Sequence, residues 1–80
     1  MFFEVRRVEL AADVVVDDVT DSRFHVLNVV QGDGILVETV GGHRYVLAYA
    51  ETLTVPAAVG AYRVRAPGTD RVRYVKAMVS

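Results

Sequence analysis

Residues 24–40 read FHVLNVVQGDGILVETV, and this stretch is the clearest indication of the fold. Its two halves, residues 24–31 and 35–40, are rich in β-branched and aromatic side chains, which fit a pleated sheet. Gly32-Asp33-Gly34 separates them, and glycine adopts the positive φ angles of a tight turn without penalty. The stretch therefore predicts two antiparallel strands joined by a turn.

The first of these strands is apolar on both of its faces. Phe24, Val26 and Val30 point one way along it, and Leu27 and Val29 point the other way. Strands buried on both faces have this pattern, whereas half-buried strands alternate between apolar and polar residues. We therefore expect a central strand that is covered on both sides and is the least exposed in the protein.

Six similar runs lie outside this stretch, each bounded by turn-forming residues. Gly41-Gly42 forms the next turn, residues 18–22 form a polar, Asp-rich loop, and Pro56 ends a run because proline cannot donate to a strand ladder. Pro67-Gly68-Thr69 separates the last two runs, which we expect to pair as a closing hairpin. The six strands are predicted at residues 2–10, 13–17, 43–49, 51–55, 61–66 and 70–79.

Eighteen of the 80 residues are valine, and no run predicts a long helix. About eight short strands at regular spacing are typical of a sandwich or barrel. We predict one all-β domain over residues 1–80, a small antiparallel β-sandwich or partial jelly roll. Its expected core positions are Leu27, Val29, Leu36, Leu53, Val55, Val64 and Val72.

The composition excludes several classes of protein. At 52% hydrophobic and 24% charged residues the chain is too apolar for disorder, and it has no apolar run of the roughly 20 residues that a membrane helix needs. A net charge of −1 gives no general attraction to nucleic acid or to anionic membranes. The absence of cysteine excludes disulfides and thiolate chemistry, and the charged start lacks a signal peptide, so we expect a cytoplasmic protein.

The candidate catalytic and metal-binding residues are few. His25 and His43 are the only histidines, and a catalytic zinc site normally needs three converging protein ligands, so we favour structural or exposed histidines over a metal site. Asp17 and Asp18 are expected to stay solvated in the polar loop. Ser22 precedes His25 closely but lacks the strand-to-helix turn of a nucleophile elbow. We therefore predict no catalytic residue and no metal ligand.

The predicted closing hairpin alternates between apolar and basic positions. The apolar positions are Tyr62, Val64, Val72 and Tyr74, and the basic positions are Arg63, Arg65, Arg71 and Arg73. Like charges that face one another across a hairpin are mildly destabilising unless an anion relieves them. The four arginines are therefore the candidate contact surface for a partner or an anionic sugar phosphate, and a solvated face paired with carboxylates is the alternative. Because the tyrosines occupy the opposite face, we expect no stacking on nucleic acid.

Several of these segments resemble a known family. FHVLNVVQGDG (residues 24–34) and TLTVPAA (residues 52–58) look like the two half-motifs of a cupin. GAYRV (residues 60–64) makes the combination similar to the carboxy-terminal, cupin-like domain of zinc-dependent type I mannose-6-phosphate isomerases. The opening FFEVRRVEL (residues 2–10) resembles the strand that enters that domain.

This resemblance implies an isomerase that interconverts mannose 6-phosphate and fructose 6-phosphate, with its zinc and catalytic groups in a larger amino-terminal part. The cupin ligand pattern would fall on Val19, Asp21, His25 and Ala61 in this chain. Valine and alanine side chains cannot bind a metal. The resemblance therefore implies no cofactor in this chain, with zinc in the amino-terminal part of the parent enzyme, and an 80-residue chain that is inactive alone.

Two hypotheses on function follow. The leading one is a non-catalytic carboxy-terminal domain of a mannose-6-phosphate isomerase, whose partner is the amino-terminal catalytic domain. The alternative is a freestanding, metal-free cupin-like module that dimerises through its open sheet edges and binds a small anionic or sugar ligand. Neither hypothesis involves nucleic acid or a membrane.

Overall fold

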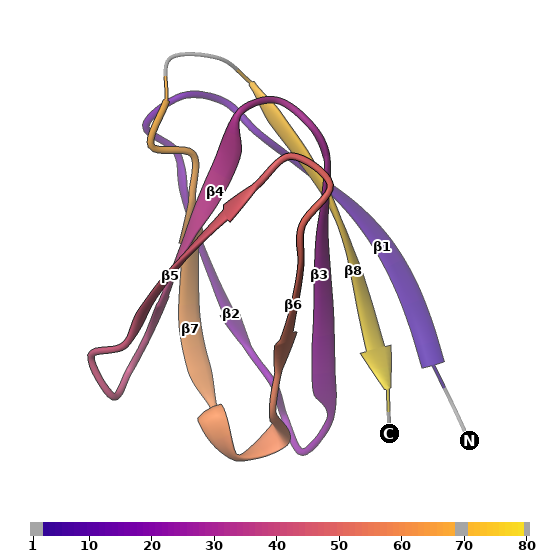
Figure 1. Ribbon diagram of the computed structural model, residues 1–80. Coiled ribbons are helices and arrows are strands. Elements are labelled where there is room, and N and C mark those ends of the chain that lie inside the picture. The colour runs from indigo at the N-terminus through magenta and orange to yellow at the C-terminus, as the bar shows by residue number, and fades with distance from the viewer. Residues whose placement is uncertain (1–2, 69–70, 80) are drawn as a thin grey trace.

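The computed structural model describes residues 3–68 and 71–79 and consists of eight strands and one short 3₁₀ helix (Figure 1). All eight predicted strands are confirmed within these residues, and residues 2 and 70 of the first and last predicted strands and residue 69 of the predicted turn lie outside them. The second strand extends to Val19, so Asp18 lies in a strand and not in the predicted loop. No helix among these residues is long and apolar enough to span a membrane. The elements are β1 (Phe3–Leu10), β2 (Val15–Val19), β3 (Phe24–Gln31), β4 (Gly34–Thr39), β5 (Arg44–Ala48), β6 (Thr52–Val55), η1 (Ala57–Val59), β7 (Ala61–Arg65) and β8 (Val72–Val79).

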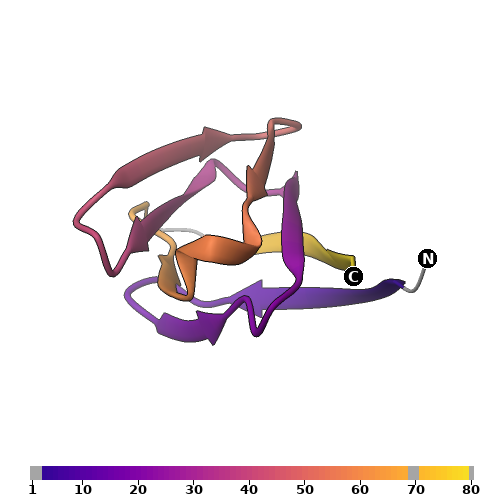
Figure 2. The same ribbon diagram turned by 90° about the horizontal axis from the view of Figure 1, so that it is seen from below.

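The strands form two four-stranded antiparallel sheets. Sheet I has the order β1-β8-β3-β6, and sheet II has the order β2-β7-β4-β5. Seen from below, the two sheets enclose a common interior (Figure 2), and η1 lies at the lower end of the sandwich in the view of Figure 1. The predicted all-β sandwich is therefore confirmed.

Most connections pass from one sheet to the other, and this corrects two predicted hairpins. β3 pairs with β6 and β8, whereas β4 pairs with β5 and β7, so the strands on either side of Gly32-Asp33-Gly34 are not partners. β7 and β8 likewise belong to different sheets, so the predicted closing hairpin is wrong. Only β4 and β5, joined by the predicted Gly41-Gly42 turn, are consecutive in the chain and paired.

The glycines after β3 have a different role from the predicted one. A Cβ atom on Gly34 would lie 2.3 Å from the carbonyl oxygen of Leu47, and one on Gly32 would lie 2.6 Å from that of Arg71. Both glycines also have positive φ angles, of 152° and 98°. They therefore permit close backbone approach where the chain crosses between sheets, which a hydrophobicity pattern does not reveal.

The core lies between the sheets and is filled from the inner face of each. Five of the predicted core residues are buried, and Leu53 is half-buried and packs against them. Leu36 lies outside this cluster. Side chains alternate along a strand, and in β4 it is the neighbours Ile35 and Val37 that point inward. Tyr62 and Tyr74, which the alternation predicts on the apolar side of their strands, are both buried. The buried apolar residues are Leu10, Leu27, Val29, Ile35, Val37, Leu47, Val55, Tyr62, Val64, Ala66, Val72 and Tyr74.

β3 is covered on one face only, which corrects the prediction of a doubly covered strand. Leu27 and Val29 are fully buried against sheet II, but Phe24 and Val30 on the other face are 39% and 44% exposed. No described element packs on that outer side of sheet I (Figure 2). The apolar residues there are accessible in a single chain.

Candidate functional site

Four polar side chains meet inside the sandwich and join the two sheets. His25 on β3 and Lys76 on β8 come from sheet I, and Asp18 on β2 and Tyr62 on β7 come from sheet II. The Nδ1 atom of His25 lies 2.6 Å from the Tyr62 hydroxyl, which in turn donates to Oδ2 of Asp18 at 3.2 Å. Lys76 Nζ donates to the same carboxylate oxygen. We call these four residues the polar cluster.

The polar cluster is largely removed from solvent. His25 and Tyr62 are each 2% exposed and Lys76 is 9% exposed. Burial alone would raise the pKa of the Asp18 carboxyl, but hydrogen bonds from Lys76 and from the Val19 backbone N–H, together with the Lys76 charge, lower it overall. Asp18 is therefore ionised and paired with the ammonium group across the interior.

The tyrosine and histidine of the cluster are neutral. Burial, the negative charge of Asp18 and the hydrogen bond to it raise the pKa of the Tyr62 hydroxyl far above its ordinary value. Burial is also the main cause that lowers the pKa of His25. The Tyr62 hydroxyl has one proton, so when it donates to Asp18, it must accept from His25. In this arrangement the proton of neutral His25 is on Nδ1.

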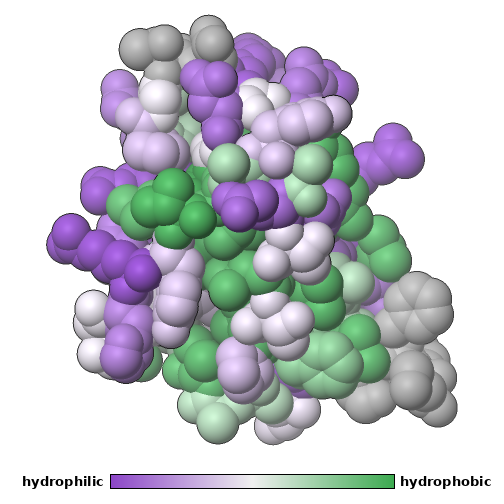
Figure 3. Space-filling view, in the orientation of Figure 1, coloured by the Kyte–Doolittle hydropathy of each residue, from purple (hydrophilic) through white to green (hydrophobic). Residues whose placement is uncertain are grey.

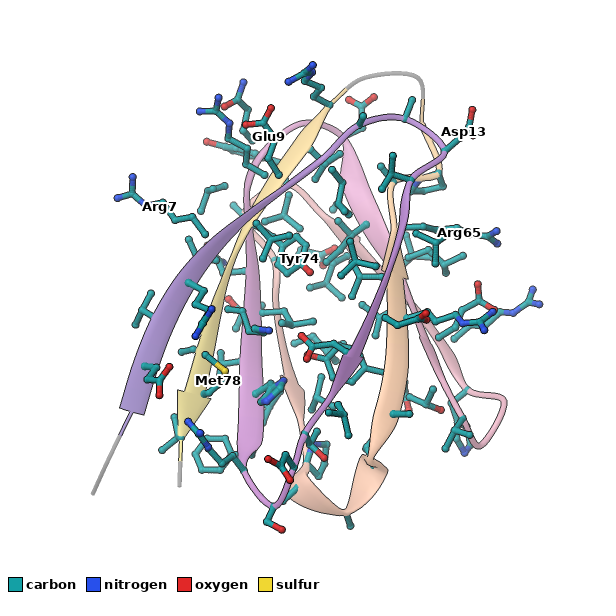
Figure 4. All side chains as sticks on the ribbon, turned by 180° about the vertical axis from the view of Figure 1, so that it is seen from behind. Arg7, Glu9, Asp13, Arg65, Tyr74 and Met78 are labelled. Carbon is teal, nitrogen blue, oxygen red and sulfur yellow. The ribbon has the colours of Figure 1, made fainter. Side chains whose placement is uncertain are left out.

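Tyr74 adds a fifth polar group to the same interior. Its side chain projects from β8 between the sheets (Figure 4) and is 1% exposed. Burial and the charge of Asp18 raise its pKa to about 12. Its hydroxyl is the one buried side-chain oxygen or nitrogen that has no hydrogen-bond partner within the described residues. An orphaned buried hydroxyl costs roughly 1–3 kcal/mol, so the interior retains unused hydrogen-bonding capacity.

The residues that the cupin ligand pattern selects do not converge on one point. Val19 and Ala61 are exposed register partners on β2 and β7, and Asp21 lies in an exposed turn. Only His25 faces the interior, where it is bound to Tyr62. Across residues 3–68 and 71–79, no three His, Cys, Asp or Glu side chains lie together in a way that could hold a metal ion.

A pocket of about 510 Å³ opens between the two sheets at their β5 and β6 edges. We call it the β5–β6 pocket. Buried Val37 and Val55 line it from opposite sheets, and exposed His43 and Tyr45 line it with rings 6.5 Å apart. Apolar surface is visible between β5 and β6 in the space-filling view (Figure 3). The full lining is Val37, Thr39, Val40, Gly41, His43, Tyr45, Leu53, Thr54, Val55, Pro56, Ala58 and Val59.

The wall of this pocket at η1 is fixed by a buried threonine. Thr20 is 1% exposed, and its hydroxyl donates to the Ala57 carbonyl oxygen at 2.8 Å and accepts from the Gly60 N–H at 3.1 Å. The Thr20 N–H also donates to the Gly60 carbonyl oxygen at 3.0 Å. These bonds hold both ends of η1, and the pocket residues Ala58 and Val59 lie between them.

The four predicted arginines do not form one surface. Arg63 donates from Nε to Asp17 at 2.9 Å, and Arg65 lies 3.3 Å from Glu38, both on sheet II. Arg71 and Arg73 share Glu9, where β1 meets β8. Glu9 and Arg65 are far apart in Figure 4. All four arginines therefore have carboxylate partners, and their contact with a ligand stays a prediction.

Sequence reasoning missed the polar cluster although its signal was present. Lys76 is the single lysine and follows Val72 and Tyr74 on the inward parity of β8. His25 likewise shares the parity of Leu27 on β3. Charged or polar residues in an otherwise apolar row indicate a buried partner on the facing sheet. That partner, Asp18, falls in the segment that the sequence predicts to be a polar loop, whereas it lies on β2.

No protein-family model matches the chain, and no curated protein matches its sequence. Solved structures match its fold. The protein NMB1881 from Neisseria meningitidis has a TM-score of 0.78 and 22% identity, covering 98% of this chain and 74% of that one. The cupin domain of Cnp3 from Schizosaccharomyces pombe has a TM-score of 0.82 and 18% identity, covering 98% of this chain and 52% of that one.

The cupin domain of an XRE family transcriptional regulator from Enterobacter cloacae has a TM-score of 0.84 and 11% identity, and the match covers 98% of this chain and 81% of that one. The chain therefore has the cupin fold, as the resemblance implied. It spans about half the length of the Cnp3 chain. None of the three carries the name of an isomerase, so the isomerase relationship stays a hypothesis.

His25 should make stability depend on pH. Its folded pKa lies below the ordinary value of 6.5, so the unfolded chain binds a proton first as the pH falls. The free energy of unfolding is then fully present above about pH 6.5 and decreases as the pH falls toward the folded pKa of His25. Urea titrations between about pH 7 and pH 5 should show this decrease in the wild type and a flatter profile in His25→Gln. The exposed control His43→Gln should keep the wild-type profile, and an unchanged profile in His25→Gln would contradict the assignment.

The Lys76 to Asp18 ion pair should matter more than the exposed pairs. Lys76→Met leaves a buried carboxylate without a counter-charge and should reduce the free energy of unfolding by roughly 3 kcal/mol, measured by urea denaturation. Asp18→Asn in the same chain should restore much of that loss, because the uncompensated charge is removed. Arg63→Met, which breaks an exposed pair, should cost less than about 1 kcal/mol. Equal losses for Lys76→Met and Arg63→Met would show that the interior pair is not special.

Proposed function

We propose that this chain is a cupin-fold binding module that holds a small, mainly apolar molecule in the β5–β6 pocket. The observation that carries the proposal is the pocket itself, because about 510 Å³ falls within the roughly 300–1,000 Å³ typical of small-molecule sites. Its lining comes from both sheets and from η1, so it belongs to the fold and not to one loop. The proposed role involves binding and no reaction. This agrees with the polar cluster, whose side chains are hydrogen-bonded or ion-paired to one another.

The lining indicates the chemistry of the ligand. Aliphatic side chains such as Val37, Leu53 and Val55 favour a hydrocarbon body through the hydrophobic effect. The polar groups are few, and His43 and Tyr45 supply an imidazole and a phenol on exposed positions. A compact apolar ring with one hydroxyl or carboxylate turned toward these two residues would satisfy both parts of the lining.

Two walls of the pocket are held in place by hydrogen bonds within the chain. Thr20 holds η1 through three hydrogen bonds, and the Thr39 hydroxyl accepts the His43 N–H at 3.2 Å. The Thr39 N–H donates to the His43 carbonyl oxygen at 2.9 Å, which closes the β4–β5 turn. A preformed site loses less conformational entropy on binding, which supports a ligand-binding role.

Filling part of the pocket should weaken binding strongly. We choose 2-naphthol as the probe because it combines an apolar bicyclic ring with one hydroxyl. In ¹⁵N NMR titrations its chemical-shift changes should cluster on the pocket lining, and Ala58→Phe should weaken binding about tenfold or more by occupying the space. Ala57→Phe is the matched control, since Ala57 is the exposed neighbour on η1 that does not line the pocket.

Two results would contradict this function. Shift changes spread over the surface, with no cluster around the β5–β6 pocket, would indicate nonspecific contact. Equal binding by Ala58→Phe and Ala57→Phe would mean that the pocket is not the site. Far-ultraviolet circular dichroism on both variants would establish that they keep the β-fold.

The second candidate is a non-catalytic carboxy-terminal domain of a mannose-6-phosphate isomerase. The similarity of residues 52–58 and 60–64 to that domain supports it, and in the fold these residues form the continuous unit β6, η1 and the start of β7. In such an enzyme the amino-terminal part would carry the zinc and the catalytic groups. This chain would cover one side of the substrate cleft and contribute stability, and its arginines would exchange a carboxylate partner for a sugar phosphate.

The isomerase hypothesis has its own tests. The purified chain should leave mannose 6-phosphate unconverted in an assay for fructose 6-phosphate, and the reading frame upstream of the codon for Phe2 in the source genome should encode the catalytic part. Turnover by the chain alone, or a stop codon directly upstream, would contradict this assignment. Loss of mannose 6-phosphate binding in Arg63→Ala and Arg71→Ala, with 2-naphthol binding retained, would assign the arginines to the sugar phosphate.

A further inference from the structure

β1 is the longest strand at an open edge of either sheet. It has 8 residues, whereas the other edge strands β2, β5 and β6 have 5, 5 and 4 residues. All of its residues pair with β8, and no described strand pairs with its other side (Figure 1). Because an antiparallel strand directs the backbone groups of alternate residues away from its partner, β1 offers a row of free N–H and C=O groups.

The charges along β1 are mainly positive. Each of its two glutamates is shared by two arginines, and a fifth arginine has no ion pair among the described residues. Arginines therefore outnumber carboxylates along this strand, although the whole chain has a net charge of −1. We call this group the β1 edge; its arginines are Arg6, Arg7, Arg23, Arg71 and Arg73, and its glutamates are Glu4 and Glu9.

Arg6 and Arg7 extend from opposite faces of β1. Side chains alternate along a strand, so Arg6 shares its side of β1 with Val8 and buried Leu10. Arg7 shares the other side with exposed Val5 and projects away from the sandwich (Figure 4). The Arg6 side chain is 67% exposed, and Arg7 is exposed as well. A strand added beside β1 would therefore meet one guanidinium group on each of its faces.

An acidic strand fits this edge better than a second copy of β1 does. Residues 4–9 read EVRRVE, which is the same in both directions. In an antiparallel pair of two β1 strands centred on this segment, Arg6 would lie opposite Arg7 of the second copy. The glutamates would meet in the same way, and like charges directly opposite one another are destabilising. Two consecutive acidic residues in an added strand would instead place one carboxylate beside each arginine.

β2 shows that a sequence of this kind forms a strand. Residues 16–19 read VDDV, and they lie in an edge strand of sheet II. Both carboxylates already have partners within the chain. Asp17 is paired with Arg63 on the outside of sheet II. Asp18 is paired with Lys76 inside the sandwich. We therefore expect the segment that complements β1 in a different protein.

We propose that β1 binds an extended acidic segment of another protein, which adds to sheet I as a fifth strand. Main-chain hydrogen bonds to the free edge supply affinity, and ion pairs with Arg6 and Arg7 select the segment. The matching pattern is two acidic residues flanked by β-branched residues, which lie opposite Val5 and Val8. β1 and β6 are the opposite edges of sheet I, so this contact does not depend on the function proposed for the β5–β6 pocket.

A pair of synthetic peptides tests the proposal. Thr-Lys-Val-Glu-Glu-Val-Lys-Thr has the matching pattern, and Thr-Glu-Val-Lys-Lys-Val-Glu-Thr has the same composition with the charges exchanged. In ¹⁵N NMR titrations of the chain, the first peptide should cause shift changes centred on β1. It should also slow hydrogen exchange at alternate β1 amides, those that do not donate to β8, because they gain a partner strand. The second peptide should bind about tenfold more weakly or less.

Variants of the chain separate the β1 edge from other surfaces. Arg6→Gln combined with Arg7→Gln should weaken binding of the first peptide about tenfold, because each exposed ion pair contributes up to a few-fold. Arg44→Gln is the matched control and should leave the affinity unchanged, since Arg44 is an exposed arginine on the edge strand β5 of sheet II. Circular dichroism would establish that the double variant is folded. If it is not, Arg7→Gln alone must weaken binding about threefold.

Several results would overturn the proposal. Absence of binding by the first peptide, equal binding of the two peptides, or equal losses in the double variant and Arg44→Gln would each do so. Binding that leaves the exchange of the β1 amides unchanged would indicate attraction of charges without strand addition. Slow exchange of the same amides before any peptide is added would assign the edge to a second copy of the chain.

Discussion

The Lys76 ammonium and the Asp18 carboxylate meet inside the sandwich, and the packing of the two sheets depends on this contact. Neither charge would be tolerated there alone, because an unpaired ion in an apolar interior is costly. Each ion also fixes the alignment of its own strand, and the Tyr62 hydroxyl extends the network to His25. A sheet that slipped by one residue would turn these groups outward, so the network specifies one register as well as one pairing of sheets.

The chain path explains how so short a domain builds two complete sheets. All but one of the connections between strands pass from one sheet to the other, so each added strand extends the interior of the sandwich. The crossing after β3 needs Gly32 and Gly34, whose missing Cβ atoms leave room for the carbonyl oxygens of Arg71 and Leu47. The crossing before β7 uses η1, and Thr20 ties that turn to the end of β2. The same turn supplies one wall of the β5–β6 pocket, so a structural connection also shapes the candidate ligand site.

The surfaces of the domain differ in chemistry. The β5–β6 pocket lies where the sheets separate at one pair of edges, and its lining is mainly apolar. The outside of sheet I carries exposed Val5 and Phe24 beside Arg7. The outside of sheet II carries ion pairs such as Arg63 with Asp17 beside exposed valines, so neither outer face is purely apolar or purely charged.

Alternation of apolar residues was sufficient to predict eight strands, the two-sheet class and five buried core positions, because side-chain direction in a strand has a period of two. It could not predict which strands pair, so Gly32-Asp33-Gly34 was interpreted as a hairpin when it is a crossing between sheets. It also could not bring Asp18 to Lys76, since 58 residues separate them and only the facing of two sheets joins them. Local pattern determines which side of a strand is apolar. The pairing of strands that are distant in the sequence determines what packs against that side. For this reason one face of β3 packs into the core, whereas Phe24 and Val30 on its other face are exposed.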